Sequence, residues 1–171
     1  MQQILKHPFI KAYFVCMILL FTSFSNLSAQ LARIKSMKNW ELSGYGKAAE
    51  RAGDVYAMID YYAEYTKRKP SDYKTCYKLA KLYFEINDFS NSKILFKRIM
   101  KSSPKKYPHS IYYLAEILRV ESKYDSAMNL YSQYQEKMRK KRGKKLFFYM
   151  SDIRIESCIY AANNVQPNKK Y

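Results

Sequence analysis

The chain has 171 residues, about the length of one globular domain, and 31 Lys and Arg against 14 Asp and Glu give a formal net charge of +17. Of its residues, 48% are hydrophobic, which supplies a core and excludes a chain that is disordered by composition. With only 4 Gly and 5 Pro, the chain is neither collagen-like nor of low complexity. Its 3 Cys are too few for a disulfide scaffold. His7 and His109 are too few for a histidine-based zinc site, so neither a metal nor a cofactor is expected.

The first 29 residues have the three-part pattern of a secretory signal peptide. Lys6 and Lys11 lie before a run of ten apolar residues over 12–21, and the segment ends in Leu27-Ser28-Ala29. We therefore predict a signal peptide over 1–29, cleaved after Ala29, and an exported protein. The alternative is an uncleaved membrane anchor, but a spanning helix needs roughly 20 apolar residues.

A sequence pattern then recurs at an interval of 34 residues. Pro70 and Pro104 are separated by this interval, and the segments that lead into them align without a gap. Three copies place a small residue and then an aromatic residue at matching positions, namely Gly46 and Tyr62, Ala80 and Phe96, and Ala115 and Tyr131. Because small residues let two helices approach closely and proline ends a helix, each copy predicts a pair of helices. The expected helices span 40–52, 55–68, 72–86, 89–102, 109–121 and 124–138.

This pattern resembles the tetratricopeptide repeat (TPR), a helix–turn–helix unit of about 34 residues. The resemblance implies an all-α fold, a TPR-type right-handed solenoid of three helix–turn–helix repeats. The expected repeats cover about 39–72, 73–106 and 108–141. The first repeat departs from the family at Met58, where alanine is usual, so looser packing is expected there.

A further helix is expected over 144–163, where apolar residues recur at three- and four-residue steps. The end of an open solenoid exposes apolar surface, so this helix would cap the third repeat. The TPR domain is thus expected over 30–164, followed by a tail or linker over 165–171. Cys76 and Cys158 would lie about two repeats apart, which favours two buried free thiols over a disulfide.

A narrower resemblance rests on features near the two ends. Ser28-Ala29-Gln30 spans the predicted cleavage point, the repeats are rich in tyrosine, and the last helix contains Ser157-Cys158 followed by Ala161. This combination resembles the TPR-bearing, OmpA-like cell-envelope proteins associated with type IX secretion. The resemblance implies an exported scaffold in the periplasm or at the periplasmic face of the outer membrane. Peptidoglycan binding belongs to a separate domain of that family and is not carried over.

The first helices of stacked repeats line a concave groove, which is the usual ligand surface of such solenoids. Lysines and aromatic residues share one face of the first helix of the second repeat, and matching positions follow in the third. The predicted groove residues are Lys74, Tyr77, Lys78, Lys81, Phe84, Tyr112, Tyr113, Glu116 and Arg119. Interleaved cationic and aromatic side chains suit a protein or peptide partner with an acidic or C-terminal segment. The alternative is a solvated helix face, because lysines are commonly exposed.

Basic residues also crowd the segment after the third repeat. This basic patch consists of Lys137, Arg139, Lys140, Lys141, Arg142, Lys144 and Lys145. Its functional interpretation is attraction to an anionic membrane or cell-wall surface. The alternative is a charged loop whose cations stabilise a helix C-terminus. We expect no nucleic-acid partner, because the predicted export argues against one and no nucleic-acid motif is present.

No catalytic motif occurs in the sequence, which has no Gly-rich phosphate loop, no HExxH and no nucleophile elbow. Asp54 and Asp88 head the expected second helices, where a carboxylate accepts from free backbone N–H groups, so they are expected to be caps. Glu116 is a single acid in the predicted groove, and His109 is expected at the surface. The sequence therefore predicts a non-enzymatic scaffold or adaptor. The alternative function is an accessory envelope subunit that contacts an anionic surface through the basic patch.

Overall fold

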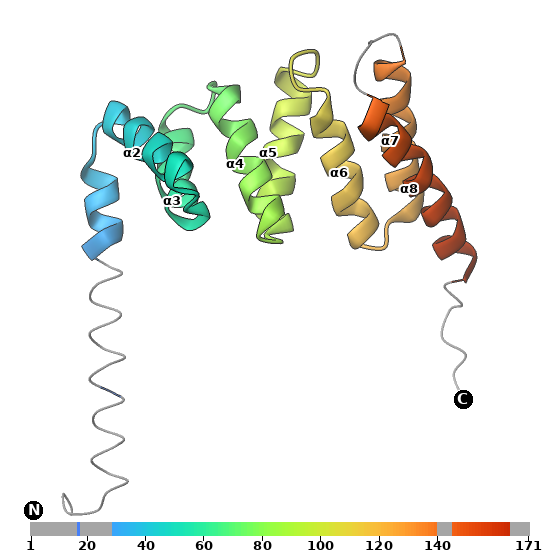
Figure 1. The fold of residues 1–171 in the computed structure, drawn as a ribbon, viewed down its shortest axis with the longest axis horizontal. Coiled ribbons are helices and arrows are strands. Elements are labelled where there is room, and N and C mark those ends of the chain that lie inside the picture. Colours follow the sequence, from blue (N-terminus) through green and yellow to red (C-terminus); the bar gives the residue numbers. More distant parts are fainter. Residues whose placement is uncertain (1–16, 18–28, 140–144, 165–171) are drawn as a thin grey trace, which may run out of the picture.

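The computed structural model describes residues 17, 29–139 and 145–164. The predicted tail and all of the predicted signal peptide except residues 17 and 29 lie outside these ranges. A short helical segment over 29–36 comes first. It is followed, as Figure 1 shows, by α2 (Asn39–Ala52), α3 (Val55–Arg68), α4 (Tyr73–Glu85), α5 (Phe89–Ser102), α6 (His109–Val120), α7 (Tyr124–Met138) and α8 (Lys145–Asn164). Every predicted helix is found, with each end within one residue of its predicted position.

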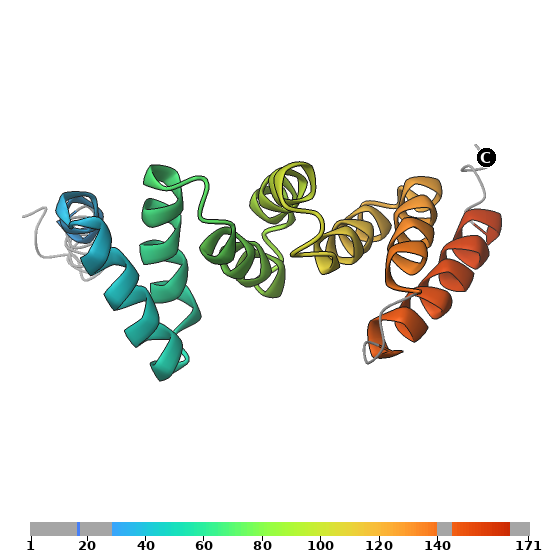
Figure 2. The same ribbon diagram turned by 90° about the horizontal axis from the view of Figure 1, so that it is seen from above.

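The helices form one row in chain order (Figure 1). Within the row, α2 packs on α3, α4 on α5 and α6 on α7, and successive pairs meet where α3 contacts α4 and α5 contacts α6. Seen from above, α2, α4 and α6 follow one side of the row and α3, α5 and α7 follow the other (Figure 2). The fold is therefore a helical solenoid of three pairs, as predicted. Among the described residues, no helix is both long enough and apolar enough to cross a bilayer.

The turn inside each pair has the same backbone geometry. Gly53, Asn87 and Ser122 occupy the same place in the three turns, and their φ angles are 71°, 61° and 59°. A positive φ is uncommon outside glycine, so its recurrence at this position marks a repeated unit. In each turn the next residue donates its backbone N–H to a carbonyl of the preceding helix: Asp54 to Ala49 at 3.0 Å, Asp88 to Tyr83 at 2.8 Å and Lys123 to Leu118 at 2.9 Å.

Two of the three second helices begin at an aspartate cap. A carboxylate oxygen of Asp54 accepts from the backbone N–H of Ala57 at 3.0 Å, and Asp88 accepts from Asn91 at 3.1 Å. These bonds satisfy donors that have no partner within the helix. The predicted capping role of both aspartates is confirmed.

The contact between the helices of a pair depends on a small residue facing an aromatic one. A Cβ atom added to Gly46 would overlap the ring of Tyr62, so only glycine fits there. In the second pair the Ser92 hydroxyl donates to the carbonyl of Ala80 at 2.9 Å, which requires a similarly close approach. The aromatic residue is buried in every pair, as the exposures of 3%, 0% and 0% show for Tyr62, Phe96 and Tyr131. Met58, where looser packing was expected, is buried as well.

The last helix packs where the capping helix was predicted. α8 lies mainly on α7 and touches α6. Its Phe147, Phe148 and Cys158 belong to the same apolar cluster as Tyr112 and Tyr134. Cys76 and Cys158 are buried free thiols, which confirms that prediction.

Candidate functional site

The three lysines of the predicted groove lie on α4. Lys74 is exposed, and Lys78 and Lys81 are half-buried. The ammonium of Lys78 pairs with Oε2 of Glu50, on α2, at 2.6 Å. Among the described residues, neither Lys74 nor Lys81 is part of an ion pair. The structure therefore leaves two of the three lysines available to an anionic ligand.

Glu50 connects the first two helical pairs. The hydrogen bond from Lys78 is the main reason that the pKa of Glu50 lies below its ordinary value, and burial opposes this shift. The hydroxyl of Tyr62 also donates to Glu50, at 3.2 Å. Burial, followed by the charge of Glu50, raises the pKa of Tyr62 to about 12, so this phenol stays protonated. Sequence reasoning did not assign Glu50 this connecting role.

The aromatic residues predicted for the groove form one continuous cluster between α4 and α6. Phe84 meets Tyr113 edge to face with 5.2 Å between ring centroids, and Tyr77 lies 6.5 Å from Tyr113. Tyr77 also stacks on Tyr107 at 5.0 Å, and Tyr113 stacks on Phe96 at 5.1 Å. The groove residues among them, Tyr77, Phe84 and Tyr113, are half-buried, so each one supports the fold and retains an exposed part.

Two predicted groove residues are instead inside the protein. Tyr112 is 5% exposed and Glu116 is 6% exposed. The ring of Tyr112 packs among those of Tyr131, Tyr134 and Phe147. Burial, followed by the charge of Glu116, raises the pKa of Tyr112 to about 12. The assignment of these two side chains to an open ligand surface is therefore wrong, because α8 and α7 cover them.

Glu116 is the centre of a polar network that joins three helices. It accepts from the Tyr131 hydroxyl of α7 at 2.7 Å, from Arg119 of α6 at 3.0 Å and from Nε of Arg154 of α8 at 2.9 Å. Burial acts to raise the pKa of Glu116, but these bonds and the two guanidinium charges outweigh it and hold that pKa below its ordinary value. Arg119, another predicted groove residue, is thus half-buried and engaged with Glu116. The sequence offered no signal for Arg154, which lies 38 residues from Glu116.

His109, which was expected at the surface, is half-buried. Its Nδ1 is 2.8 Å from the hydroxyl of Tyr134, and its ring centroid is 4.7 Å from that of Phe147 on α8. The imidazole therefore belongs to the packing between α6, α7 and α8.

Only part of the basic patch can be placed. Lys137 is half-buried near the end of α7, and Arg139, just beyond it, is exposed. Both line a hollow with Glu136. The other members Lys140, Lys141, Arg142 and Lys144 lie outside the described residues. Lys145 begins α8, but its side chain lies outside the description.

Comparison with solved structures shows which fold these helices form. The chain is similar to the TPR2B domain of yeast Sti1, solved as a complex with pHsp70, at a TM-score of 0.53 and 19% sequence identity, over 77% of this chain and 100% of that one. The fold is that of a TPR domain. No protein-family model and no curated protein matches this sequence.

Proposed function

We propose that this TPR protein is a non-enzymatic scaffold or adaptor that holds a segment of a partner protein against α4 and α6. The proposal rests on two kinds of side chain that lie together. Among the described residues, Lys74 and Lys81 form no ion pair. Beside them are the half-buried rings of Tyr77, Phe84 and Tyr113. Cationic groups attract an acidic segment, and aromatic rings supply contact area once it has docked.

The ligand class follows from the side chains that remain available. Ammonium groups bind carboxylates as point charges, so an acidic stretch and a free C-terminal carboxylate both suit this surface. The similar TPR2B domain of Sti1 was solved with a partner, pHsp70, which supports a peptide-binding role. Tyr112 and Glu116 are not part of the proposed surface, because they are buried.

We further propose that the protein works in the periplasm or at the periplasmic face of the outer membrane, in connection with type IX secretion. This part rests on the predicted signal peptide over 1–29 and on the resemblance of Ser157, Cys158 and Ala161 to the OmpA-like envelope proteins. The alternative function is an accessory subunit that contacts an anionic membrane or cell-wall surface through the basic patch. Lys137 and exposed Arg139 favour this second candidate.

Capture from envelope extract by the purified protein tests the proposed surface. The informative variant is Lys81→Glu, and its matched control is Lys97→Glu, which makes the same charge change at an exposed position of α5 on the other side of the row. We expect Lys81→Glu to lose partners that the parent and Lys97→Glu both retain. Recovery of the same partners by Lys81→Glu would contradict the proposal.

Salt separates the two candidate functions. Attraction to an anionic surface fades steeply between low and physiological ionic strength, because exposed charges are screened. A segment that also contacts Tyr77, Phe84 and Tyr113 is expected to stay bound. Binding that disappears with salt and is insensitive to Lys81→Glu would instead favour the surface-contact function.

A further inference from the structure

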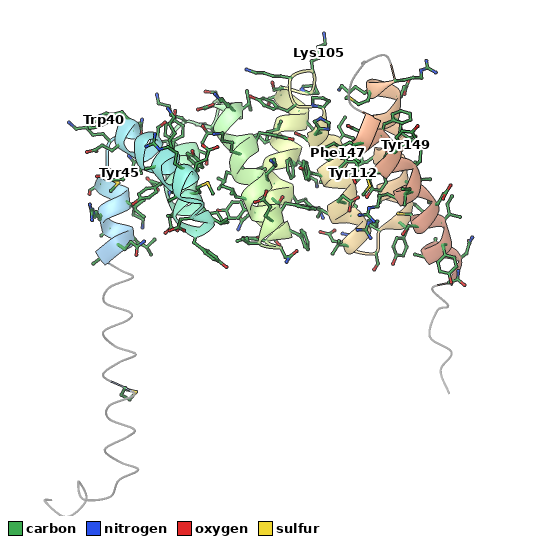
Figure 3. All side chains as sticks on the ribbon, in the orientation of Figure 1. Trp40, Tyr45, Lys105, Tyr112, Phe147 and Tyr149 are labelled. Atoms are coloured by element: carbon green, nitrogen blue, oxygen red, sulfur yellow. The ribbon has the colours of Figure 1, made fainter. Side chains whose placement is uncertain are left out.

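Positive charge gathers along one edge of the helical row. Because successive helices alternate in direction, α3, α5 and α7 all end at the same edge, and the connections from α3 to α4 and from α5 to α6 lie there (Figure 1). Figure 3 shows Lys105 at this edge. We call the exposed basic residues at these helix ends and connections the basic edge, which consists of Lys67, Lys69, Lys101, Lys105, Lys106 and Arg139.

The charge of the basic edge is not neutralised by ion pairs. None of the ion pairs among the described residues includes any of its six side chains. The acids closest in the sequence to Lys67 and Lys69 are engaged elsewhere. Glu64 pairs with Arg68, and Asp72 accepts from backbone N–H groups at the start of α4.

Two further acids lie at this edge, and each has a basic neighbour. Glu136, near the end of α7, is exposed and is followed directly by Lys137. Glu41, in the first turn of α2, is half-buried and accepts from the backbone N–H of the exposed Lys38 at 2.6 Å. Neither acid therefore reverses the sign of the charge along the edge.

The opposite edge, where the turns inside the pairs lie, has the contrary balance. Within residues 51–54, 85–88 and 120–125, the acids are Asp54, Glu85, Asp88, Glu121 and Asp125, and the basic residues are Arg51 and Lys123. Lys123 is paired with Glu121. The row of helices thus has one basic edge and one acidic edge, which gives it a preferred orientation toward an anionic surface.

The layout of the basic edge suits an extended anionic surface. Its six residues are spread along the row instead of converging on one point, and with neighbouring helices roughly 9 Å apart they cover on the order of 40 Å from α3 to α7. Five of the six are lysines, which act as point charges on flexible stems and impose no fixed geometry on a ligand. Lipid headgroups require charge in this form. A nucleic acid is less favoured, because the sequence contains no nucleic-acid motif.

We propose that the basic edge contacts a bilayer containing anionic phospholipids, with the row of helices lying along the membrane surface. The inference rests on the second candidate function and extends it, because it names the lipid and a surface that reaches from α3 to α7 beyond the basic patch. Lys81 and the rings of Tyr77, Phe84 and Tyr113 are not part of the basic edge. One molecule can therefore hold a partner against α4 and α6 while it is bound to the membrane.

Co-sedimentation of the purified protein with vesicles tests the contact. Vesicles of phosphatidylcholine are compared with an equal mixture of phosphatidylcholine and phosphatidylglycerol. The parent is expected to bind the anionic vesicles at least about tenfold more tightly at low salt, with a steep loss as salt is added. Replacing both Lys101 and Lys105 by Gln is expected to weaken this binding about 25-fold, because each lysine near an anionic surface contributes about fivefold.

The matched control replaces Lys47 and Arg51 by Gln. Both are exposed in the last two turns of α2, toward the opposite edge, and the net charge changes by the same amount. This variant is expected to bind like the parent, and circular dichroism verifies that both variants are folded. Equal weakening of the two variants would show that net charge, and not the basic edge, drives binding, which overturns the proposal.

Three further results also overturn it. Equal binding to the two kinds of vesicle would mean that anionic lipid is not recognised, and it would count against the second candidate function as well. Binding to anionic vesicles that is unchanged by the Lys101 and Lys105 substitutions would confine the contact to the basic patch, so the second candidate function would stand without the basic edge. Tighter binding to a duplex oligonucleotide than to anionic vesicles at the same salt would assign the edge to nucleic acid.

Lysine acetylation of the parent, with and without anionic vesicles, tests the orientation. Lys67, Lys101 and Lys105 are expected to be protected by the vesicles, whereas Lys47 and Lys123, which are exposed away from the basic edge, are expected to keep their reactivity. Mass spectrometry measures the modification of each lysine. Uniform protection of all five lysines would contradict the proposed orientation.

Discussion

The ring of Tyr62 occupies the space that a side chain at Gly46 would need. A Cβ atom on Gly46 would lie 2.8 Å from Cδ1 of Tyr62 and closer still to Cε1. Tyr62 is itself held in place, because it is 3% exposed and its hydroxyl donates to Glu50. The glycine therefore sets the distance between α2 and α3.

Replacing Gly46 by alanine is expected to destabilise the protein by about 1–3 kcal/mol, because the ring of Tyr62 cannot move without disturbing the core around it. The control is Gly44→Ala in the same helix, where nothing lies within 4 Å of the added Cβ. That substitution is expected to stabilise by about 0.5–1 kcal/mol through helix propensity. Urea denaturation measures both free energies of unfolding. Equal effects of the two substitutions would show that Tyr62 exerts no steric control.

The repeated turn predicts a stabilising substitution. Ser122 has a φ of 59°, a conformation that costs a residue with a side chain about 1–2 kcal/mol and glycine almost nothing. Ser122→Gly is therefore expected to raise the free energy of unfolding by roughly 0.5 kcal/mol, after the greater chain entropy of glycine is subtracted. Ser126→Gly, within α7, is the control and is expected to lower it by a similar amount. A loss of stability in Ser122→Gly would contradict the strain argument.

The network around Glu116 predicts a dependence of stability on pH. Its pKa is lower in the folded protein than the ordinary value of 4.5, so the folded state favours the ionised carboxylate. The resulting stabilisation is complete above the unfolded pKa and is lost as the pH falls through the folded pKa. The difference in unfolding free energy between the parent and Glu116→Gln is thus expected to be largest near pH 7 and to shrink below about pH 4. A difference that stays constant between pH 7 and pH 3 would contradict the assignment.

Arg154 is expected to hold α8 in place through Glu116. Arg154→Met keeps most of the apolar length of the side chain but removes the donor to Glu116, which retains Arg119 and Tyr131. Hydrogen bonds to charged groups stabilise a protein somewhat more than neutral ones, but partial exposure to water reduces the contribution of this one. We therefore expect the free energy of unfolding to fall by about 1 kcal/mol. Hydrogen exchange of the α8 amides is expected to accelerate, while that of α2 and α3 is unchanged. Arg51→Met, at an exposed position of α2, serves as the control.

Most of the helical architecture follows from local patterns in the sequence. Helix bounds and the Asp54 and Asp88 caps depend on residues within one or two helical turns, so spacing alone predicted them. The environments of Tyr112 and Glu116 depend instead on where α8 packs. Helical periodicity tells which residues share a face but not which neighbour covers it, and the Arg154 that reaches Glu116 is 38 residues away.

The three pairs share one backbone plan but differ in the polar atom placed at the same buried position. The first and third pairs have a tyrosine there, and its hydroxyl donates a hydrogen bond to a glutamate. Tyr62 donates to Glu50, and Tyr131 donates to Glu116. The middle pair has Phe96, which needs no acceptor. Each of these acids also pairs with a cation of the unit that follows, Glu50 with Lys78 of α4 and Glu116 with Arg154 of α8. A pair moved to another slot would therefore separate its acid from that cation. The order of the pairs along the chain is therefore as much a part of the encoded structure as the repeat itself, and shuffling them would not give an equivalent protein.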